Sequence, residues 1–322
     1  MIDVVIHYNT MPYDIVKPPS NCCYQETYER LLRRIVTGVV LHADETEVKL
    51  RFGTGYVWVL GSIEEVVFMY RPNREGDFLH DLLKDFHGVL VTDFYAAYDS
   101  IGCPQQKCLI HLMRDMNQEL LENPFDAELR ALTDPFGVLL REIITTIDKH
   151  GLRKRFLRKH APGVTRFFQF VMAQSFHSEA AEGLRARLLK YQEKLFTFIE
   201  YDGVTWNNNV AEHAIKRFAL YRKDTVRSLE ETGIRDYLTL LSICHTCRMR
   251  GVSFLRFLLS RERDLELFRS KSHRRPHCKG TELDLYPDAY MPTRLAGLQK
   301  LEERKAQSKK GIEPNRPLTE SK

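Results

Sequence analysis

Long apolar runs and a secretory leader are both missing from this sequence of 322 residues. No segment stays apolar over the roughly 20 residues that a membrane-spanning helix needs. Residues 1–7 do not combine a basic segment with a long apolar one, as a signal peptide would. Seven cysteines, an odd number without regular spacing, are typical of a reducing compartment. These absences exclude membrane-spanning and small disulfide-rich secreted proteins, and we expect a cytoplasmic protein with no membrane partner.

A large net charge is also missing, because the formal charge at pH 7 is only +5. A hydrophobic content of 43% and a charged content of 28% are typical of a globular protein with a sizeable core. The positive charge is concentrated in two runs: Arg153, Lys154, Arg155, Arg158 and Lys159, and then Arg269, Lys271, Arg274, Arg275 and Lys279. Such clusters suit a polyanion such as nucleic acid, although a solvated helix face and a solvated tail explain them equally well.

Segments rich in β-branched and aliphatic residues predict the strands of one sheet. They cover residues 39–46, 56–62, 66–70, 88–93 and 106–110. Short turns join the first three, which predicts an antiparallel meander. An amphipathic helix over 75–86 precedes the fourth, and such a crossover implies parallel pairing with the first strand. This order predicts an α/β fold with a ribonuclease-H-like mixed sheet.

Helical patterns dominate the rest of the sequence. A helix is expected over 24–36, and residues 112–200 are helical throughout, with breaks near Pro124, Pro135, Gly151, Pro162 and Gly163. Further helices are expected from Asn209 and over 237–259, with a break at Gly251. We therefore divide the chain into an N-terminal leader and helix (1–36), the first half of the sheet core (37–116), a large all-helical insertion (117–200), the completion of the core (201–260), and a basic, partly disordered tail (261–322).

Two of the predicted strands lead into an acidic residue. Asp44 follows the apolar part of the first strand and Asp93 ends the fourth, so parallel pairing would bring their carboxylates side by side. Adjacent carboxylates repel unless a cation lies between them, and hard divalent cations prefer oxygen ligands. Glu212 lies in the first turn of a later helix, behind an Asn run that can cap it, which also fits an ordinary capped helix. A third carboxylate from that helix would complete a two-metal site for phosphodiester chemistry.

Six short pieces of the sequence occur in an order that resembles a known family. They lie at residues 42–46, 55–59, 92–99, 108–111, 208–212 and 222–223. Together they resemble the transposases of the insertion-sequence-66 (IS66-like) family, in the D-D-E superfamily, over residues 28–258. The resemblance implies that Asp44, Asp93 and Glu212 form the catalytic, metal-binding triad, with two Mg²⁺ ions for which Mn²⁺ can substitute. It also implies DNA cleavage and strand transfer at insertion-sequence ends, that is, DNA transposition and recombination.

The same resemblance implies that the partner is DNA, both the insertion-sequence ends and the target. On DNA we expect a homo-oligomer, helped by accessory proteins of the same element, in the prokaryotic nucleoid. Lys216, Arg217, Arg222 and Lys223 follow the glutamate and are expected to contact DNA phosphates. His111 starts a helix after a core strand, where it would contact the scissile phosphate or serve as a structural histidine.

The cysteines offer two weaker candidate sites. Cys103, Cys108 and His111 lie close together in the sequence, and Cys244 and Cys247 have a C-x-x-C spacing, so each group could contribute zinc ligands. Neither group has an obvious second half, and buried thiols explain both better than zinc does.

Longer members of the family carry an upstream DNA-binding region, which we expect this chain to lack. A catalytic fragment, a decayed copy and a domain that works with separate proteins are therefore alternatives. Two other functions fit the same residues: a catalytically inactive remnant that only binds DNA, and a simple two-metal nuclease without strand transfer.

Overall fold

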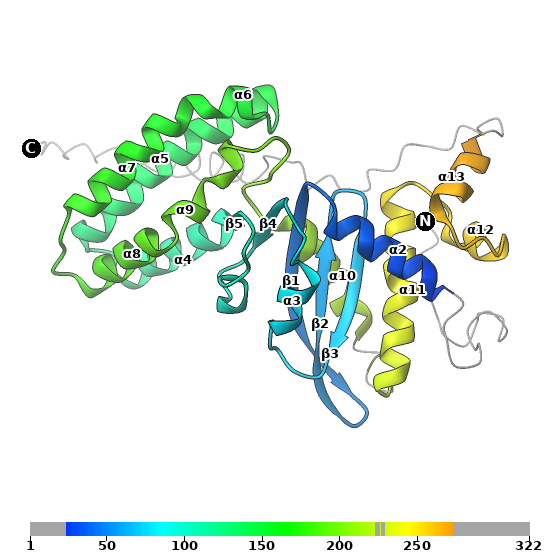
Figure 1. The fold of residues 1–322 in the computed structure, drawn as a ribbon. Coiled ribbons are helices and arrows are strands. Elements are labelled where there is room, and N and C mark those ends of the chain that lie inside the picture. Colours follow the sequence, from blue (N-terminus) through cyan, green and yellow to red (C-terminus); the bar gives the residue numbers. More distant parts are fainter. Residues whose placement is uncertain (1–23, 223–225, 227–228, 274–322) are drawn as a thin grey trace, which may run out of the picture. The chain divides into compact units, whose positions relative to one another are not determined.

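The computed structural model describes residues 24–222, 226 and 229–273, which fold as an α/β protein (Figure 1). The predictions for residues 1–23 and for most of the basic tail, 274–322, lie outside the described residues. Within the described ranges, no helix combines the length and the apolarity that crossing a bilayer requires.

The sheet has five strands in the order β3-β2-β1-β4-β5. They are β1 (Val40–Leu50), β2 (Gly53–Gly61), β3 (Val66–Arg71), β4 (Val89–Thr92) and β5 (Gln105–Lys107). The first three are antiparallel neighbours, β4 runs parallel to β1, and β5 runs parallel to β4. The prediction of a mixed sheet, antiparallel first and then parallel, is confirmed. The last strand is shorter than predicted because the chain already turns into a helix at Leu109.

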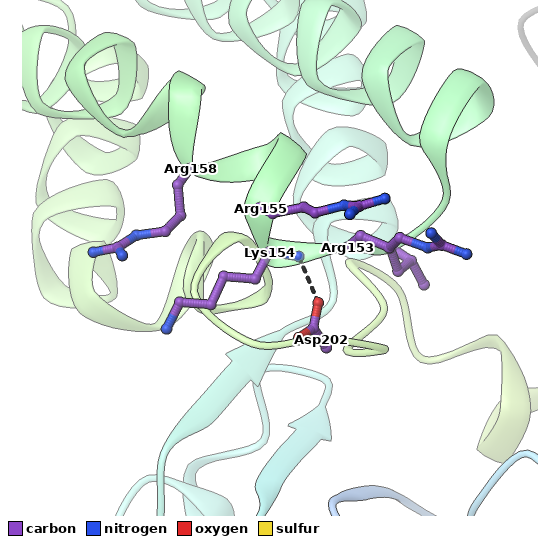
Figure 2. Close-up of a pocket in the computed structure, with 6 residues that line it drawn as sticks. Arg153, Lys154, Arg155, Arg158 and Asp202 are labelled. Atoms are coloured by element: carbon purple, nitrogen blue, oxygen red, sulfur yellow. Dashed lines mark hydrogen bonds between the residues drawn. The ribbon is translucent and has the colours of Figure 1, made fainter.

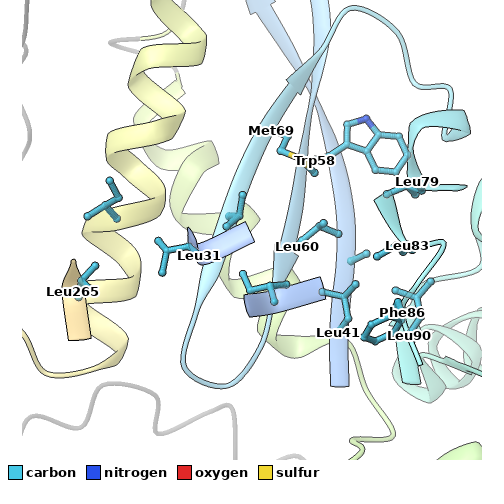
Figure 3. Close-up of a cluster of buried hydrophobic side chains, with 14 of the residues drawn as sticks. Leu31, Leu41, Trp58, Leu60, Met69, Leu79, Leu83, Phe86, Leu90 and Leu265 are labelled. Atoms are coloured by element: carbon cyan, nitrogen blue, oxygen red, sulfur yellow. The ribbon is translucent and has the colours of Figure 1, made fainter. Parts of the chain in front are cut away.

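One face of the sheet is buried under helices from both ends of the described chain (Figure 3). Leu41 and Ala43 of β1 point to this face. They share a cluster of buried side chains with α2 (Gln25–Val36), α3 (Asp77–Leu82), α11 (Glu231–Met249), α12 (Phe254–Leu259) and α13 (Leu265–His273). The helix predicted over 24–36 is therefore confirmed, whereas the helix predicted over 75–86 is only the short α3.

The other face of the sheet is covered by α10 (Asn209–Arg222) and by another side of α11. Ala211, Ala214 and Phe218 of α10 pack there against a cluster that includes Val48 of β1. Side chains alternate along a strand, so the even-numbered residues of β1, Asp44 among them, face α10. This alternation decides which side of the sheet can carry a site.

Helix α11 also protects the edge strand β3. The Ser242 hydroxyl accepts a hydrogen bond from the backbone N–H of Phe68 at 2.9 Å, and Thr246 Oγ1 accepts one from Val66 at 3.2 Å. These side chains satisfy donors that would otherwise be free to pair with another strand. The predicted break at Gly251 is confirmed: its φ is +65°, and it separates α11 from α12.

Between β5 and α10 the chain is helical, as predicted. The helices are α4 (Leu109–Glu122), α5 (Ala127–His150), α6 (Lys154–Leu157), α7 (Ala161–Ala173), α8 (Glu179–Lys190) and α9 (Gln192–Leu195). Phe136 and Phe167 pack with ring centroids 5.7 Å apart, and Phe168 and Phe196 at 6.1 Å. The predicted break near Pro135 is wrong, since Pro135 lies inside α5. Buried residues on both sides of the proline hold one continuous helix, so packing outweighs the missing N–H.

Candidate active site

Two acidic residues lie where β1 and β4 run side by side. The parallel register pairs His42 with Val91; Asp44 follows two residues later on β1, and Asp93 follows directly after the end of β4. Asp44 Oδ1 accepts a hydrogen bond from the N–H of Glu45, and Asp93 Oδ1 accepts one from Tyr95, both at 2.9 Å. The position of Asp44 on β1 and of Asp93 directly after the neighbouring parallel strand β4 agrees with the strand order read from the sequence.

Helix α10 brings Glu212 to the same region. The Glu212 N–H donates to the Asn208 carbonyl at 3.1 Å, in the first turn of the helix. The Asn208 side chain bonds to β1: its Nδ2 donates to the Ala43 carbonyl at 2.8 Å, and its Oδ1 lies 3.2 Å from His42 Nδ1. The prediction that the Asn run caps the helix is confirmed in part: Asn207 Oδ1 accepts a hydrogen bond from the N–H of Asn209 at 3.2 Å, whereas the Asn208 side chain bonds to β1. The role of Asn208 depends on a tertiary contact, so local sequence could not reveal it.

The charges of the neighbouring acids affect the protonation of Asp44. Burial, and then the negative charges of Glu45, Asp93 and Glu212, together raise the pKa of Asp44 to about 8. Glu45 itself points to the opposite face, where Arg74 Nη2 donates to it at 2.7 Å and Tyr98 Oη at 2.6 Å. A site that disfavours the charged form of Asp44 favours a cation or a proton beside it.

Two buried polar atoms face each other without a hydrogen bond. His111 Nδ1, in the first turn of α4, lies 3.8 Å from Glu212 Oε1, which is too long for a hydrogen bond. Neither atom has another partner among the described residues, although the Glu212 side chain is only 13% exposed. Unsatisfied buried atoms are costly, so a pair of them indicates room for a further ligand. The residues present therefore fit a bound cation or a substrate oxygen at this point.

Glu212 takes part in two possible donor sets. Cys108, His111 and Glu212 place one ligand atom each within 4.8 Å of one another, a sulfur, nitrogen and oxygen set that suits transition metals. Among the described residues, Asp44, Asp93 and Glu212 do not form a group as close as this one, but they offer only oxygens, which suit Mg²⁺. The Cys108 thiol accepts a hydrogen bond from the N–H of Asn208 at 3.3 Å, and burial raises its pKa to about 11.

A buried ion pair lies beside Asp93, and no pattern in the sequence predicts it. The Lys107 side chain is 0% exposed, and its Nζ lies 2.9 Å from Asp99 Oδ1 and 3.2 Å from the Thr92 hydroxyl. Tyr191 Oη also donates to Asp99 at 3.0 Å. Asp99 therefore serves as a structural partner of Lys107. Through Lys107 and Tyr191, it connects the end of β5 to the helical segment.

The remaining residues proposed from the sequence fall into three groups. Lys216 is exposed and lies 3.4 Å from Glu212 Oε2, and Arg217 is half-buried on the same helix. Arg222 ends α10, but its side chain and Lys223 lie outside the described residues. Cys244 and Cys247 are free thiols in α11, and burial raises their pKa values to about 11 and about 12.

The fold and the site define an α/β protein with carboxylates on a mixed sheet and on a late helix that packs against it. The chain belongs to the IS66 transposase family: the family described as "Transposase IS66 family" matches residues 12–236, well over half of its length. It is also similar to the uncharacterized protein y4qI of Sinorhizobium fredii (strain NBRC 101917 / NGR234), with 23% identity over 261 residues. That alignment covers 71% of this chain and 48% of the relative, so the chain spans about half of the relative's length.

Proposed function

We propose that this chain is the catalytic part of a D-D-E transposase, with a ribonuclease-H-like sheet that carries Asp44 and Asp93. Glu212 is the third acid of the triad. The observation that carries the proposal is the buried Glu212 Oε1, which has no hydrogen-bond partner in the described part of the chain and whose charge acts on Asp44. Membership of the IS66 transposase family supports the same reading.

The donor set fits Mg²⁺, with Mn²⁺ as a substitute, held by Asp44, Asp93 and Glu212. Two such ions, when bound, activate a water or a 3′-hydroxyl and stabilise the leaving oxygen of a phosphodiester. Burial makes the carboxylate form of Asp44 unfavourable without a positive charge nearby. A divalent cation offsets that cost, and Asn208 holds the strand and the helix at a fixed separation.

The remaining polar residues have roles on the DNA side of the reaction. His111 Nδ1 lies beside Glu212 without a partner in the described chain and is free to donate to a phosphate oxygen. Lys216 and Arg217 follow Glu212 on α10, and we assign them contacts with DNA phosphates near the site.

A nicking assay on supercoiled plasmid with Mg²⁺ or Mn²⁺ tests the proposal. Asp44→Asn, Asp93→Asn and Glu212→Gln each keep the size of the side chain and remove its charge. Each should reduce nicking at least about 100-fold, more than the usual loss for outer partners of metal ligands. Glu119→Gln, at an exposed position of α4, is the matched control and should retain full activity.

Two outcomes, one from a strand-transfer assay and one from a DNA-binding assay run beside the nicking assay, would replace the proposal. Nicking without joining of a 3′-hydroxyl end to target DNA identifies a two-metal nuclease. DNA binding without any nicking by the parent chain identifies a non-catalytic remnant. Parent-level nicking by all three acid variants would rule out the triad itself.

A further inference from the structure

A basic pocket lies in the helical segment, apart from the candidate active site. It has a volume of about 620 Å³ and is lined by Leu152, Arg153, Lys154, Arg155, Arg158 and Asp202 (Figure 2). Four cationic side chains thus gather around one hollow, in the first of the two basic runs in the sequence.

The pocket is built from two chain segments that are held together by backbone bonds. The Lys154 N–H donates to Asp202 Oδ1 at 2.7 Å, the bond drawn in Figure 2. The Gly203 N–H donates to the Leu152 carbonyl at 2.8 Å, and Gly203 has a φ of +75°, which favours glycine. The arginines therefore start from a fixed backbone and not from a loose charged loop.

Charge in the pocket is only partly neutralised. Arg158 Nε lies 3.2 Å and Lys154 Nζ 3.8 Å from Glu200 Oε2, so these two share one carboxylate. Arg153 and Arg155 have no carboxylate partner among the described residues, and in Figure 2 they extend away from Lys154 and Arg158. The pocket keeps two guanidinium groups available for an external anion.

The neighbourhood of Arg155 is strongly positive. Its guanidinium lies 4.5 Å from the centroid of the Phe156 ring, and that ring stacks on His150 at 4.1 Å. The pKa of His150 is lowered, first by loss of solvent and then by Lys149, Lys159 and Arg155. The positive potential that disfavours protonation of His150 also attracts an anion such as phosphate.

The same short segment joins the pocket to the candidate active site. Asp202 lines the pocket, and Trp206 accepts a hydrogen bond through its carbonyl from the N–H of Leu109 at 2.9 Å, next to Cys108. Four residues span at most about 14 Å of extended chain. One turn of duplex DNA covers about 34 Å, which is longer than this segment, so one duplex is long enough to reach both places.

We propose that Arg153 and Arg155 bind the phosphate backbone of duplex DNA whose reacting strand lies at Asp44, Asp93 and Glu212. The inference rests on the proposed function, and it adds the path of the bound duplex from the candidate active site to this pocket. Guanidinium groups pair with phosphate oxygens in a bidentate way, and phosphate contacts fix the position of a duplex without reading its sequence.

The test measures binding of the full chain to a labelled duplex of about two helical turns, in EDTA so that catalysis plays no part. Anisotropy is recorded between about 50 and 200 mM salt. Loss of two phosphate contacts by Arg153→Ala/Arg155→Ala should flatten the slope of log K against log salt by about 1.8 and weaken binding at least about tenfold. Arg141→Ala/Arg256→Ala removes two exposed arginines elsewhere and should change neither value. An unchanged slope in the first variant would overturn the proposal.

A variant with the opposite effect guards against loss by misfolding. Glu200→Gln removes the carboxylate shared by Lys154 and Arg158, so it should tighten binding and steepen the slope. Unchanged or weaker binding by this variant would also count against the pocket. If DNA binding depends on the two arginines but the chain nicks no DNA, the DNA-binding surface is upheld and the proposed function is refuted. If the chain nicks DNA but neither variant changes the salt slope, the proposed function is upheld and the DNA-binding surface is refuted.

Discussion

The fully buried side chain of Asn208 sets the spacing between two of the proposed catalytic acids. Its amide bonds to the carbonyl of Ala43, the residue before Asp44, and it lies one helical turn before Glu212. Burial lowers the pKa of His42 to about 4, so the ring is neutral near pH 7 and its Nδ1–H can donate to Asn208 Oδ1. A single amide thus connects strand β1 to helix α10.

Replacement of this amide tests that role. Asn208→Ala leaves the Ala43 carbonyl without its buried donor, which should lower the free energy of unfolding by about 1–3 kcal/mol. The rate of nicking should also fall, by about 10- to 100-fold, because the helix is no longer held at its distance from Asp44. Denaturant unfolding and the plasmid assay measure the two effects. Asn209→Ala, at the next position, is the control, and an equal loss of activity there would remove the special role of Asn208.

The lowered pKa of the buried His245 makes the stability of the protein depend on pH. Burial, and then Arg217 and Arg248, lower its pKa to about 3, whereas an unfolded histidine titrates near about 6.5. Between these values the unfolded chain binds the proton and the native chain does not. The stabilisation is complete above pH about 6.5 and is lost as pH falls toward 3, with a slope of up to about 1.4 kcal/mol per pH unit.

His245→Gln removes this titration. We expect urea unfolding at several pH values to show a shallower loss of stability in acid for His245→Gln, and the parental slope for His87→Gln at an exposed position. If the acid slope of the parent persisted in His245→Gln, another group would have to cause it.

At the scale of elements, docking of α10 on the sheet decides whether Glu212 reaches the other acids. Phe218 is fully buried, and its ring centroid lies 6.3 Å from that of Phe68 on β3. Phe218→Ala should lower the free energy of unfolding by about 3–5 kcal/mol. Leu220→Ala removes a side chain of the same helix that is 73% exposed, and it should change stability by less than about 0.5 kcal/mol. Similar unfolding curves for the two variants would show that α10 is not held by this face.

The elements also show where sequence patterns succeed and fail. The strand order follows from apolar runs and turn lengths, so the mixed sheet could be predicted. The extents of α3 and α5 could not: α3 ends at Leu82, short of its apolar pattern, and α5 continues through Pro135 because buried neighbours hold it. Sequence propensity therefore predicts roughly where a helix or strand lies, whereas tertiary packing determines where it ends.

Across the whole molecule, the proposed site depends on segments far apart in the sequence. Asp44, Asp93 and Glu212 could be proposed from the strand order and the family resemblance. Asn208 and the buried Lys107 could not, because an asparagine before a helix reads as a cap and a lysine reads as exposed. Their roles arise only when the strand, the helix and the helical segment are packed together.

Binding of Mn²⁺ tests the central claim most directly, because the claim is that acids from three segments hold divalent cations at a common site. Electron paramagnetic resonance of free Mn²⁺ gives the affinity of the full chain without any need for a DNA substrate. Asp44→Asn and Glu212→Gln should each weaken binding at least about tenfold, a change of about 1.4 kcal/mol, while Glu119→Gln should bind like the parent. Parental affinity in both acid variants would contradict the assignment of Asp44 and Glu212 to a common metal site.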